Sequence, residues 1–371
     1  MFSSVFLFGG TGDVGRRVVD LLLAHSDYRI TLVSRRGGSE TDRIRHLSID
    51  LAAGNVEEMI NGSVAVVNLT EATPPALAAT IVRSGGTFLD TSATPEYVTA
   101  LENEIKAARG PGLGILCVGT APGLSTLMAA EVASIQETSS IEVGIELGLG
   151  RHYGWAATEW FFEAIGTRFI LAGSEGKFTE MPGKSSRRFG FGEDNRLRFA
   201  FGIGFPVQGI SPLGQSLPVR SFLAVEPAIV TRIVMGLLRI GLGPVLARKA
   251  MPLTRTMLKL PALGETRTRI SAEGLGKDGI PVGDVRLVAG DQAEVTAAMI
   301  VATLRAVETD GCHAIGATTI SDHLTLDAAL EELRSLLPSM QIVTWKSYKG
   351  VARRAQQSSK FGNRNGTTTS K

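Results

Sequence analysis

Short apolar runs alternate with amphipathic segments through the first third of the chain. Six short runs predict strands, most of them rich in β-branched and aromatic residues: 4–8, 28–36, 46–50, 63–70, 87–93 and 114–119. Between several of them, apolar positions recur at helical spacing, over 13–23, 75–85 and 96–109. This alternation predicts an α/β fold with an N-terminal doubly wound parallel sheet over residues 1–136.

The pattern changes beyond about residue 140. Residues 140–150 alternate apolar and polar side chains, which predicts a strand with one exposed face, and further β-like runs follow. A β-hairpin is predicted to turn at 277–279, and helices are predicted at 154–166 and 229–247. We therefore expect an α+β substrate and dimerisation domain over 137–315, and a homodimer.

Composition and charge narrow the classes of function. The chain has 371 residues, of which 44% are apolar, enough for two hydrophobic cores. The net charge is only +2, and the last stretch, 346–371, holds seven basic residues and no acidic one. Without this stretch the chain is net acidic, so no nucleic-acid partner is expected, and 346–371 is predicted to be a disordered basic tail.

The most apolar stretch, 229–247, is interrupted by Arg232 and Arg239 and is too short to span a bilayer. The two arginines lie seven residues apart and share a helix face, which predicts an amphipathic helix. Such a helix would make a weak contact with a membrane surface, contact a partner subunit, or pack between domains.

The numbers of cysteine and histidine residues bear on the compartment and on metal binding. Two cysteines far apart fit a reducing compartment, and no signal segment precedes the first strand, so we expect a cytoplasmic protein. The five histidines are scattered, and no metal site is predicted.

Three glycines follow the first strand at the spacing of a dinucleotide-binding turn. Gly9 would permit the tight turn, Gly12 the approach of a pyrophosphate, and Gly15 the packing of helix on strand. The helix N-terminus would then present free N–H groups to the phosphates. The N-terminal sheet is therefore predicted to be a Rossmann domain, with further cofactor contacts from Thr11, Asp13 and Val14.

The end of the second strand predicts which dinucleotide binds. An NAD enzyme would have an acidic residue here, whereas this chain has Ser34, Arg35 and Arg36. Guanidinium groups suit a 2′-phosphate, so we predict NADP(H) and a small-molecule substrate. Because ligands bind at the carboxyl ends of parallel strands, the remaining predicted cofactor contacts are Asp50, Leu51, Asn68, Leu69, Thr70, Thr91, Ser92, Thr120, Pro122 and Gly123.

Several stretches resemble one family, the saccharopine dehydrogenase-like NADP-dependent oxidoreductases. They are "GGTGDVG", "AVVNLT", "GGTFLDTSATPEYVTALE", "GILCVGTAPGLSTLMAAEVA" and "GKDGIPVGDVRLVAGDQAEVTAAMIVATLRAV". The resemblance covers about the first 135 residues and 270–340. It implies C-terminal helices, 316–345, that return to the first domain, and hydride transfer at the C=N bond of a small amino-acid-like substrate.

Two departures from the family's pattern bear on catalysis. Saccharopine reductase and its closest relatives have an acidic residue where this chain has Ala121, whereas the loop after the fourth strand has Glu71, a candidate general acid or base. A carboxylate there would alternatively cap the next turn. His152 and Tyr153 are candidate proton donors. Substrate-binding candidates are Arg151 and Arg220, which would hold a carboxylate, and Glu159; surface or packing roles remain alternatives for each.

Of three other functions, the first is disfavoured by the residues and the other two stay open. A short-chain reductase would need Tyr-x-x-x-Lys, and no tyrosine of this chain has a lysine four residues on. A trans-acting C=C or C=O reductase of the same fold, in a lipid, polyketide or secondary-metabolite pathway, would suit the apolar middle of the chain. The missing acidic residue at Ala121 leaves open a protein that binds NADP(H) without turnover.

Overall fold

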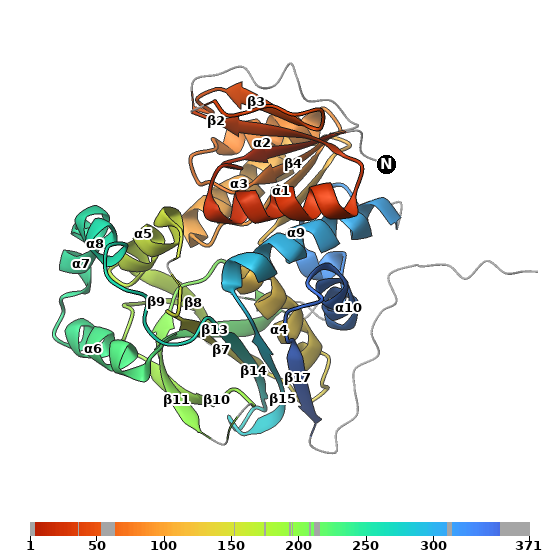
Figure 1. Ribbon diagram of the computed structural model, residues 1–371. Helices are drawn as coiled ribbons and strands as arrows, with labels where there is room; N and C mark the ends of the chain where they lie inside the picture. The colour runs from red at the N-terminus through yellow and green to blue at the C-terminus, as the bar shows by residue number, and fades with distance from the viewer. Residues whose placement is uncertain are drawn as a thin grey trace, which may run out of the picture.

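The computed structural model describes residues 4–35, 37–52, 64–151, 153–173, 176–192, 194, 196–207, 209–210, 216–309 and 314–348. Two large sheets lie one above the other, with helices between and around them (Figure 1). Both the N-terminal doubly wound sheet and the α+β part that follows it are confirmed.

The first sheet has seven parallel strands among the described residues, in the order β16-β6-β5-β4-β1-β2-β3. Their bounds are β1 Ser4–Phe8, β2 Arg29–Ser34, β3 Ile44–Ser48, β4 Val64–Asn68, β5 Thr87–Asp90, β6 Leu113–Leu116 and β16 Gly316–Thr319. The crossover helices are α1 Asp13–His25, α2 Pro75–Arg83 and α3 Pro95–Ala108. The carboxyl ends of all these strands lie along one edge.

Alternation along each strand divides the core of this domain between two faces. Phe6 and Phe8 of β1 pack with α2 and α3, whereas Val5 and Leu7 pack on the opposite face with α1. Helix α9, Gln292–Thr309, lies beside α1 on that second face (Figure 1). Each strand is therefore buried on both sides.

The second sheet is mixed, and runs β10-β11-β13-β7-β14-β15-β17 with β12 paired to β13. Among the strands that the structure describes in this sheet, only β13 and β7 pair in parallel. The bounds are β7 Ser140–Gly148, β10 Ser186–Gly190, β11 Leu197–Ile203, β12 Gly209–Ile210, β13 Leu217–Glu226, β14 Thr268–Leu275, β15 Pro281–Ala289 and β17 Val343–Tyr348. The predicted hairpin turn at 277–279 is confirmed, and a separate pair is formed by β8 Phe169–Gly173 and β9 Gly176–Glu180.

The prediction of an exposed face for 140–150 is wrong. Strand β7 is the middle of the second sheet, and its Glu142 and Glu146 are buried. Their charges are compensated across the sheet: Glu146 pairs with Arg269 at 2.8 Å and Arg198 at 3.2 Å, and Glu142 pairs with Arg187. A buried carboxylate is tolerated when it is paired, so the alternation reflects ion pairs rather than solvent.

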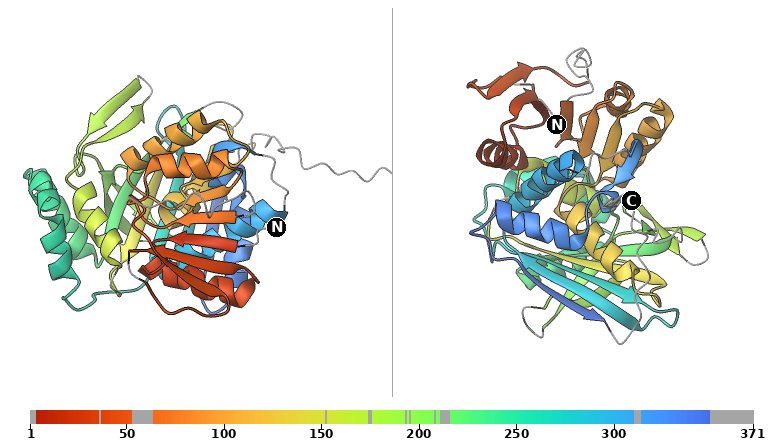
Figure 2. Two further views of the ribbon diagram at one scale, coloured as in Figure 1. Left: turned by 90° about the horizontal axis from the view of Figure 1, so that it is seen from above. Right: turned by 90° about the vertical axis from the view of Figure 1, so that its right-hand side faces the viewer.

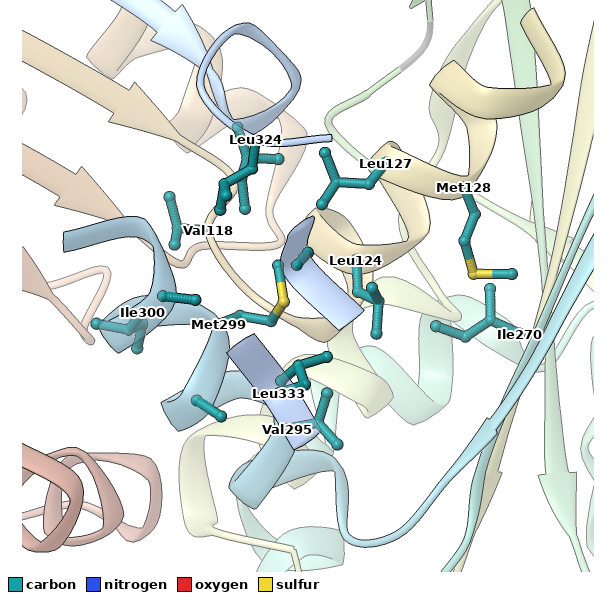
Figure 3. Close-up of a cluster of buried hydrophobic side chains, with 14 of the residues drawn as sticks. Val118, Leu124, Leu127, Met128, Ile270, Val295, Met299, Ile300, Leu324 and Leu333 are labelled. Atoms are coloured by element: carbon teal, nitrogen blue, oxygen red, sulfur yellow. The ribbon is translucent and has the colours of Figure 1, made fainter. Parts of the chain in front are cut away.

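Helices α4, Ser125–Ala133, and α9 join the two sheets. Leu124, Leu127 and Met128 meet Met299 of α9 and Ile270 of β14 in one cluster of buried side chains (Figure 3). The remaining helices are α5 Trp155–Ala164, α6 Ala228–Arg239, α7 Gly243–Arg248, α8 Ala250–Met257 and α10 Leu326–Leu336. Helices α6 to α8 form one outer flank of the molecule (Figures 1 and 2).

The C-terminal segment returns to the first domain, as expected, but not by helices alone. Helix α10 packs on α9, and β16 adds a seventh strand beside β6. Strand β17 instead joins the second sheet, so 346–348, placed in the predicted tail, form part of a strand because they pair with β15. The rest of that tail lies outside the described residues.

Candidate active site

The turn after β1 has the geometry that its glycines predict. Gly9 adopts a positive φ of 79°, and a Cβ added to Gly15 would lie 2.3 Å from the carbonyl oxygen of Gly10, so helix and turn touch backbone to backbone. Gly10 is equally constrained, since its added Cβ would lie 2.7 Å from Leu32. The sequence prediction omitted Gly10, although the Gly-Gly pair at the strand end was a visible signal.

The N-terminus of α1 is open to an anion. Its N-cap residue is Gly12, which has no side chain to satisfy the first N–H groups. Thr11 is exposed at the turn, and its carbonyl accepts a hydrogen bond from Arg16 at 3.0 Å. These residues fit a pyrophosphate, whose charge the free N–H groups and the helix dipole would stabilise.

The carboxyl end of β2 carries the residues predicted to read the ribose. Ser34 is half-buried and Arg35 is exposed; Arg36 lies outside the described residues. Asp50 accepts a hydrogen bond from the backbone N–H of Ala52 at 3.1 Å. Leu51 is buried in the core of the first domain, so it has a packing role. Of the two arginines predicted to contact a 2′-phosphate, the structure therefore describes Arg35, whose side chain is exposed.

A cavity of about 480 Å³ lies at the carboxyl ends of β4, β5 and β6, and we name it the strand-end cavity. From the first sheet it is lined by 69–72, 91–93 and 119–122, and Val14 of α1 also lines it. The second sheet and its helices supply mainly apolar side chains: Ile145, Leu147, Leu149, Trp160, Phe161, Phe205, Val225, Val230 and Met257. The cavity therefore places an apolar wall opposite the strand ends.

Three carboxylates are the charged groups of this lining. Glu159 and Glu163 are one helical turn apart on α5, and Glu71 reaches the cavity from the loop after β4. Desolvation, followed by the charges of Glu159 and Glu71, raises the pKa of Glu163. Glu71 also accepts a hydrogen bond from the backbone N–H of Thr94 at 3.1 Å, so this bond ties the loop after β4 to the start of α3 and not to the next turn.

Tyr153 lines the same cavity but directs its hydroxyl to the backbone. The hydroxyl donates to the carbonyl of Gly148 at 2.9 Å, and burial raises the pKa of Tyr153 above its ordinary value. Proton donation to a substrate would require breaking that hydrogen bond. The other candidate donor, His152, lies outside the described residues.

A comparison with protein families identifies the first domain. Residues 5–110 match the model of the saccharopine dehydrogenase NADP binding domain. The N-terminal domain is therefore similar to the saccharopine dehydrogenase NADP-binding domain over these residues. Its cofactor is NADP(H), as the turn after β1 and Arg35 predicted.

Comparison with curated proteins finds no match. Among solved structures, C. glutamicum DAP dehydrogenase in complex with DAP is 12% identical, with a TM-score of 0.44, over 90% of this chain and 99% of that one. Dihydrodipicolinate reductase from Paenisporosarcina sp. TG-14 is 10% identical, with a TM-score of 0.41, over 87% and 100%. Aspartate dehydrogenase from Thermotoga maritima is 11% identical, with a TM-score of 0.37, over 83% and 97%.

Two of the predicted cofactor contacts, Asn68 and Ser92, are buried and form hydrogen bonds with Asp90. Asn68 is buried, donates to Asp90 at 2.7 Å, and accepts from Thr73 at 2.6 Å. The backbone N–H and hydroxyl of Ser92 both donate to Asp90 at 2.9 Å. Burial, opposed by these hydrogen bonds, raises the pKa of Asp90 to about 6. The sequence prediction did not include Asp90, which lies inside the predicted strand 87–93 and is the last residue of β5 in the structure.

Of the remaining residues at the strand ends, some line the strand-end cavity and others make hydrogen bonds within the protein. Leu69 and Thr70 line the cavity, and the hydroxyl of Thr91 donates to the carbonyl of Asn68 at 3.0 Å. Thr120 is buried and its hydroxyl lies 2.8 Å from that of Thr296, which ties the next turn to α9. Pro122 and Gly123 are buried in this turn, where Gly123 has a φ of 135°.

The two arginines expected to hold a substrate carboxylate do not line the strand-end cavity. Arg151 pairs with Asp13 of α1 and with Asp291 before α9, each at 3.2 Å, and so joins the second sheet to the NADP-binding domain. Arg220 projects from β13 towards Glu142 and Glu180, at 3.8 and 3.7 Å. Both guanidinium groups are used by carboxylates of the chain itself.

Proposed function

We propose that this chain catalyses NADP(H)-dependent interconversion of an apolar amine and its imine, with hydride transfer at the carbon of the C=N bond. The observation that carries the proposal is the lining of the strand-end cavity: apolar side chains with Glu71, Glu159 and Glu163, and no lysine, arginine or histidine among the lining residues that the structure describes. A cationic amine or iminium gains from these carboxylates, whereas a substrate carboxylate would be repelled. The proposal therefore departs from the amino-acid-like substrate that the family resemblance implies.

The cavity's position supports this chemistry. It adjoins the open N-terminus of α1 and the strand ends of the NADP-binding domain, where a Rossmann domain holds its ligand. When bound, NADPH supplies a hydride to the carbon of the C=N bond. The glutamates would hold the charged nitrogen, while Trp160 and Phe205, with ring centroids 5.5 Å apart, would position the apolar part and exclude water.

A second function is favoured by the same apolar wall. Reduction of a C=C or C=O bond in an apolar substrate needs no charged partner for a nitrogen, so in that case the glutamates would be dispensable. The two functions are therefore separable by the dependence of turnover on the carboxylates.

Turnover of NADPH tests the proposal directly. NADPH oxidation is measured with aliphatic amines paired with aldehydes or ketones, with amino acids paired with keto acids, and with ketones or enoyl thioesters alone. We expect turnover with the aliphatic pairs, and a KM for the amine raised about five- to tenfold in Glu163→Gln, about 1 kcal/mol. Glu104→Gln, which removes an exposed carboxylate on α3 outside the cavity, is the matched control.

Three results would overturn the proposal. A preference for amino acid and keto acid pairs would show that a carboxylate is accepted. Turnover of ketones or enoyl thioesters alone, unaffected by Glu163→Gln, would establish the second function. NADPH binding without turnover of any substrate would indicate a binding protein.

A further inference from the structure

Helices α6 to α8 and the residues that follow them, 228–263, form a flank of one charge sign, which we name the basic flank. It contains six basic residues, all exposed: Arg232, Arg239, Arg248, Lys249, Arg255 and Lys259. No acidic residue occurs between 227 and 264. In Figure 1 and in the left view of Figure 2, these helices lie on the outside of the molecule. The flank therefore presents positive charge to whatever approaches it.

The same flank concentrates exposed aliphatic side chains. Of the thirteen large hydrophobic side chains exposed in the described part of the chain, seven lie here, and none of the seven is aromatic: Ile229, Ile233, Ile240, Val245, Met251, Leu260 and Leu263. A single exposed apolar residue needs no explanation, but a segment of 35 residues that holds more than half of the exposed large hydrophobic side chains needs one.

Helix α6 shows how the two kinds of side chain are arranged. Ile229, Ile233 and Ile240 follow one another at intervals of four and seven residues, and so form one exposed stripe. Arg232 and Arg239 lie along one side of this stripe, while Thr231, Met235 and Leu238 are buried against the sheet. The helix thus has an apolar stripe flanked by cations in addition to its packed face.

The arginine side of α6 faces a second cavity, of about 1000 Å³. Arg188 and Arg196 line it together with Arg232 and Arg239. Arginines outnumber carboxylates in its lining, seven to four, and the other three arginines, Arg198, Arg267 and Arg269, are paired with carboxylates of the same lining. Guanidinium groups bind phosphate in a bidentate manner, so this cavity suits the phosphate of a lipid headgroup beside the aliphatic stripe.

We propose that the basic flank docks the protein on an anionic membrane surface. Aliphatic side chains with flanking arginine and lysine are the pattern of helices that lie in a bilayer interface. No helix in the described ranges is long and apolar enough to cross a bilayer, so α6 would lie on the surface rather than span it. A second copy is a poorer occupant, because a twofold contact would oppose two flanks of the same charge.

Docking would bring the strand-end cavity close to the lipid. Val230 of α6 and Met257 of α8 line that cavity, so the helices of the basic flank also form part of its wall. The docking proposal does not depend on the proposed reaction, because it concerns the outer face of these helices.

Vesicle cosedimentation of the full chain tests the docking. We expect the protein to sediment with vesicles of phosphatidylcholine and phosphatidylserine in equal parts but not with phosphatidylcholine alone, and salt should release it. The double variant Arg232→Gln/Arg239→Gln should bind at least about tenfold more weakly. So should Ile233→Asn/Ile240→Asn, which retains both arginines. Arg29→Gln/Arg83→Gln removes two exposed arginines of the NADP-binding domain and serves as the control.

All variants retain residues 349–371, so any contribution of those basic residues is the same in each. Undiminished binding of NADPH verifies that each variant is folded. Absence of binding to the anionic vesicles would overturn the proposal, as would equal losses in the control and in Arg232→Gln/Arg239→Gln. A change of oligomeric state in the isoleucine variant, with vesicle binding unchanged, would assign the flank to contact between copies of the chain instead.

Discussion

Replacing Asp90 by asparagine should change how the stability of the protein depends on pH. Asp90 is fully buried at the carboxyl end of β5, and its oxygens accept hydrogen bonds from Asn68 and Ser92. Burial is the largest influence and raises the pKa of Asp90 from 3.8 to about 6. Asparagine has almost the same shape but cannot ionise, so Asp90→Asn isolates the effect of the charge.

The sign follows from proton linkage. Because the folded-state pKa is raised, the folded protein holds this proton over a range in which the unfolded chain has released it, and stability falls as pH rises from about 4 to about 6. At 1.36 kcal/mol per pKa unit, the total loss is about 3 kcal/mol. Roughly half of it falls between about pH 5 and about pH 8. Relative to wild type, Asp90→Asn should therefore gain about 1.5 kcal/mol of unfolding free energy over that interval.

Urea unfolding at a series of pH values, followed by circular dichroism, measures this difference. Hydrogen bonds lost in the variant shift both ends of the series equally, so the slope alone reports the ionisation. Asp20→Asn, which removes an exposed carboxylate on α1, controls for general charge effects. A difference between Asp90→Asn and wild type that stays constant with pH, or that shrinks as pH rises, would refute the reasoning.

Three further predictions concern cofactor and substrate. Arg35→Asp should weaken NADPH binding more than about tenfold and leave NADH binding unchanged, because the exposed guanidinium at the end of β2 would contact the 2′-phosphate. A fluorescence titration compares this variant with Arg29→Asp, at the other end of β2. Equal losses of affinity for both cofactors would reject this role. Glu71→Gln retains an oxygen that accepts from Thr94, so the local structure should be kept while kcat falls and NADPH affinity stays intact. Unchanged steady-state turnover would leave Glu71 with its hydrogen bond to Thr94 alone. Ala157→Trp should reduce turnover without altering NADPH affinity, because Ala157 lines the strand-end cavity; full activity would mean that substrate does not enter it.

The dinucleotide turn and its cofactor were predictable from sequence because they rest on residues close together in the chain. Gly9, Gly12 and Gly15 act within one strand, turn and helix, and Arg35 follows on the next strand. The alternation of strands and helices likewise reports local periodicity, which is why the parallel sheet was recognised. The polar, half-buried β16 escaped prediction because its four residues become a strand only by pairing with β6.

Only the tertiary structure decided which charged side chains are paired within the chain and which line the cavity. An alternating strand is the same in sequence whether its polar face meets water or buried arginines, so β7 was assigned an exposed face. Arg151 and Arg220 were expected in a substrate site, but their carboxylate partners are distant in sequence, at Asp13, Asp291, Glu142 and Glu180. The same long-range folding brings Glu71 and Glu163 to one cavity. Sequence alone determined the cofactor, because its contacts are local, and only the tertiary structure decided the chemistry of the cavity, because that depends on which distant charges meet.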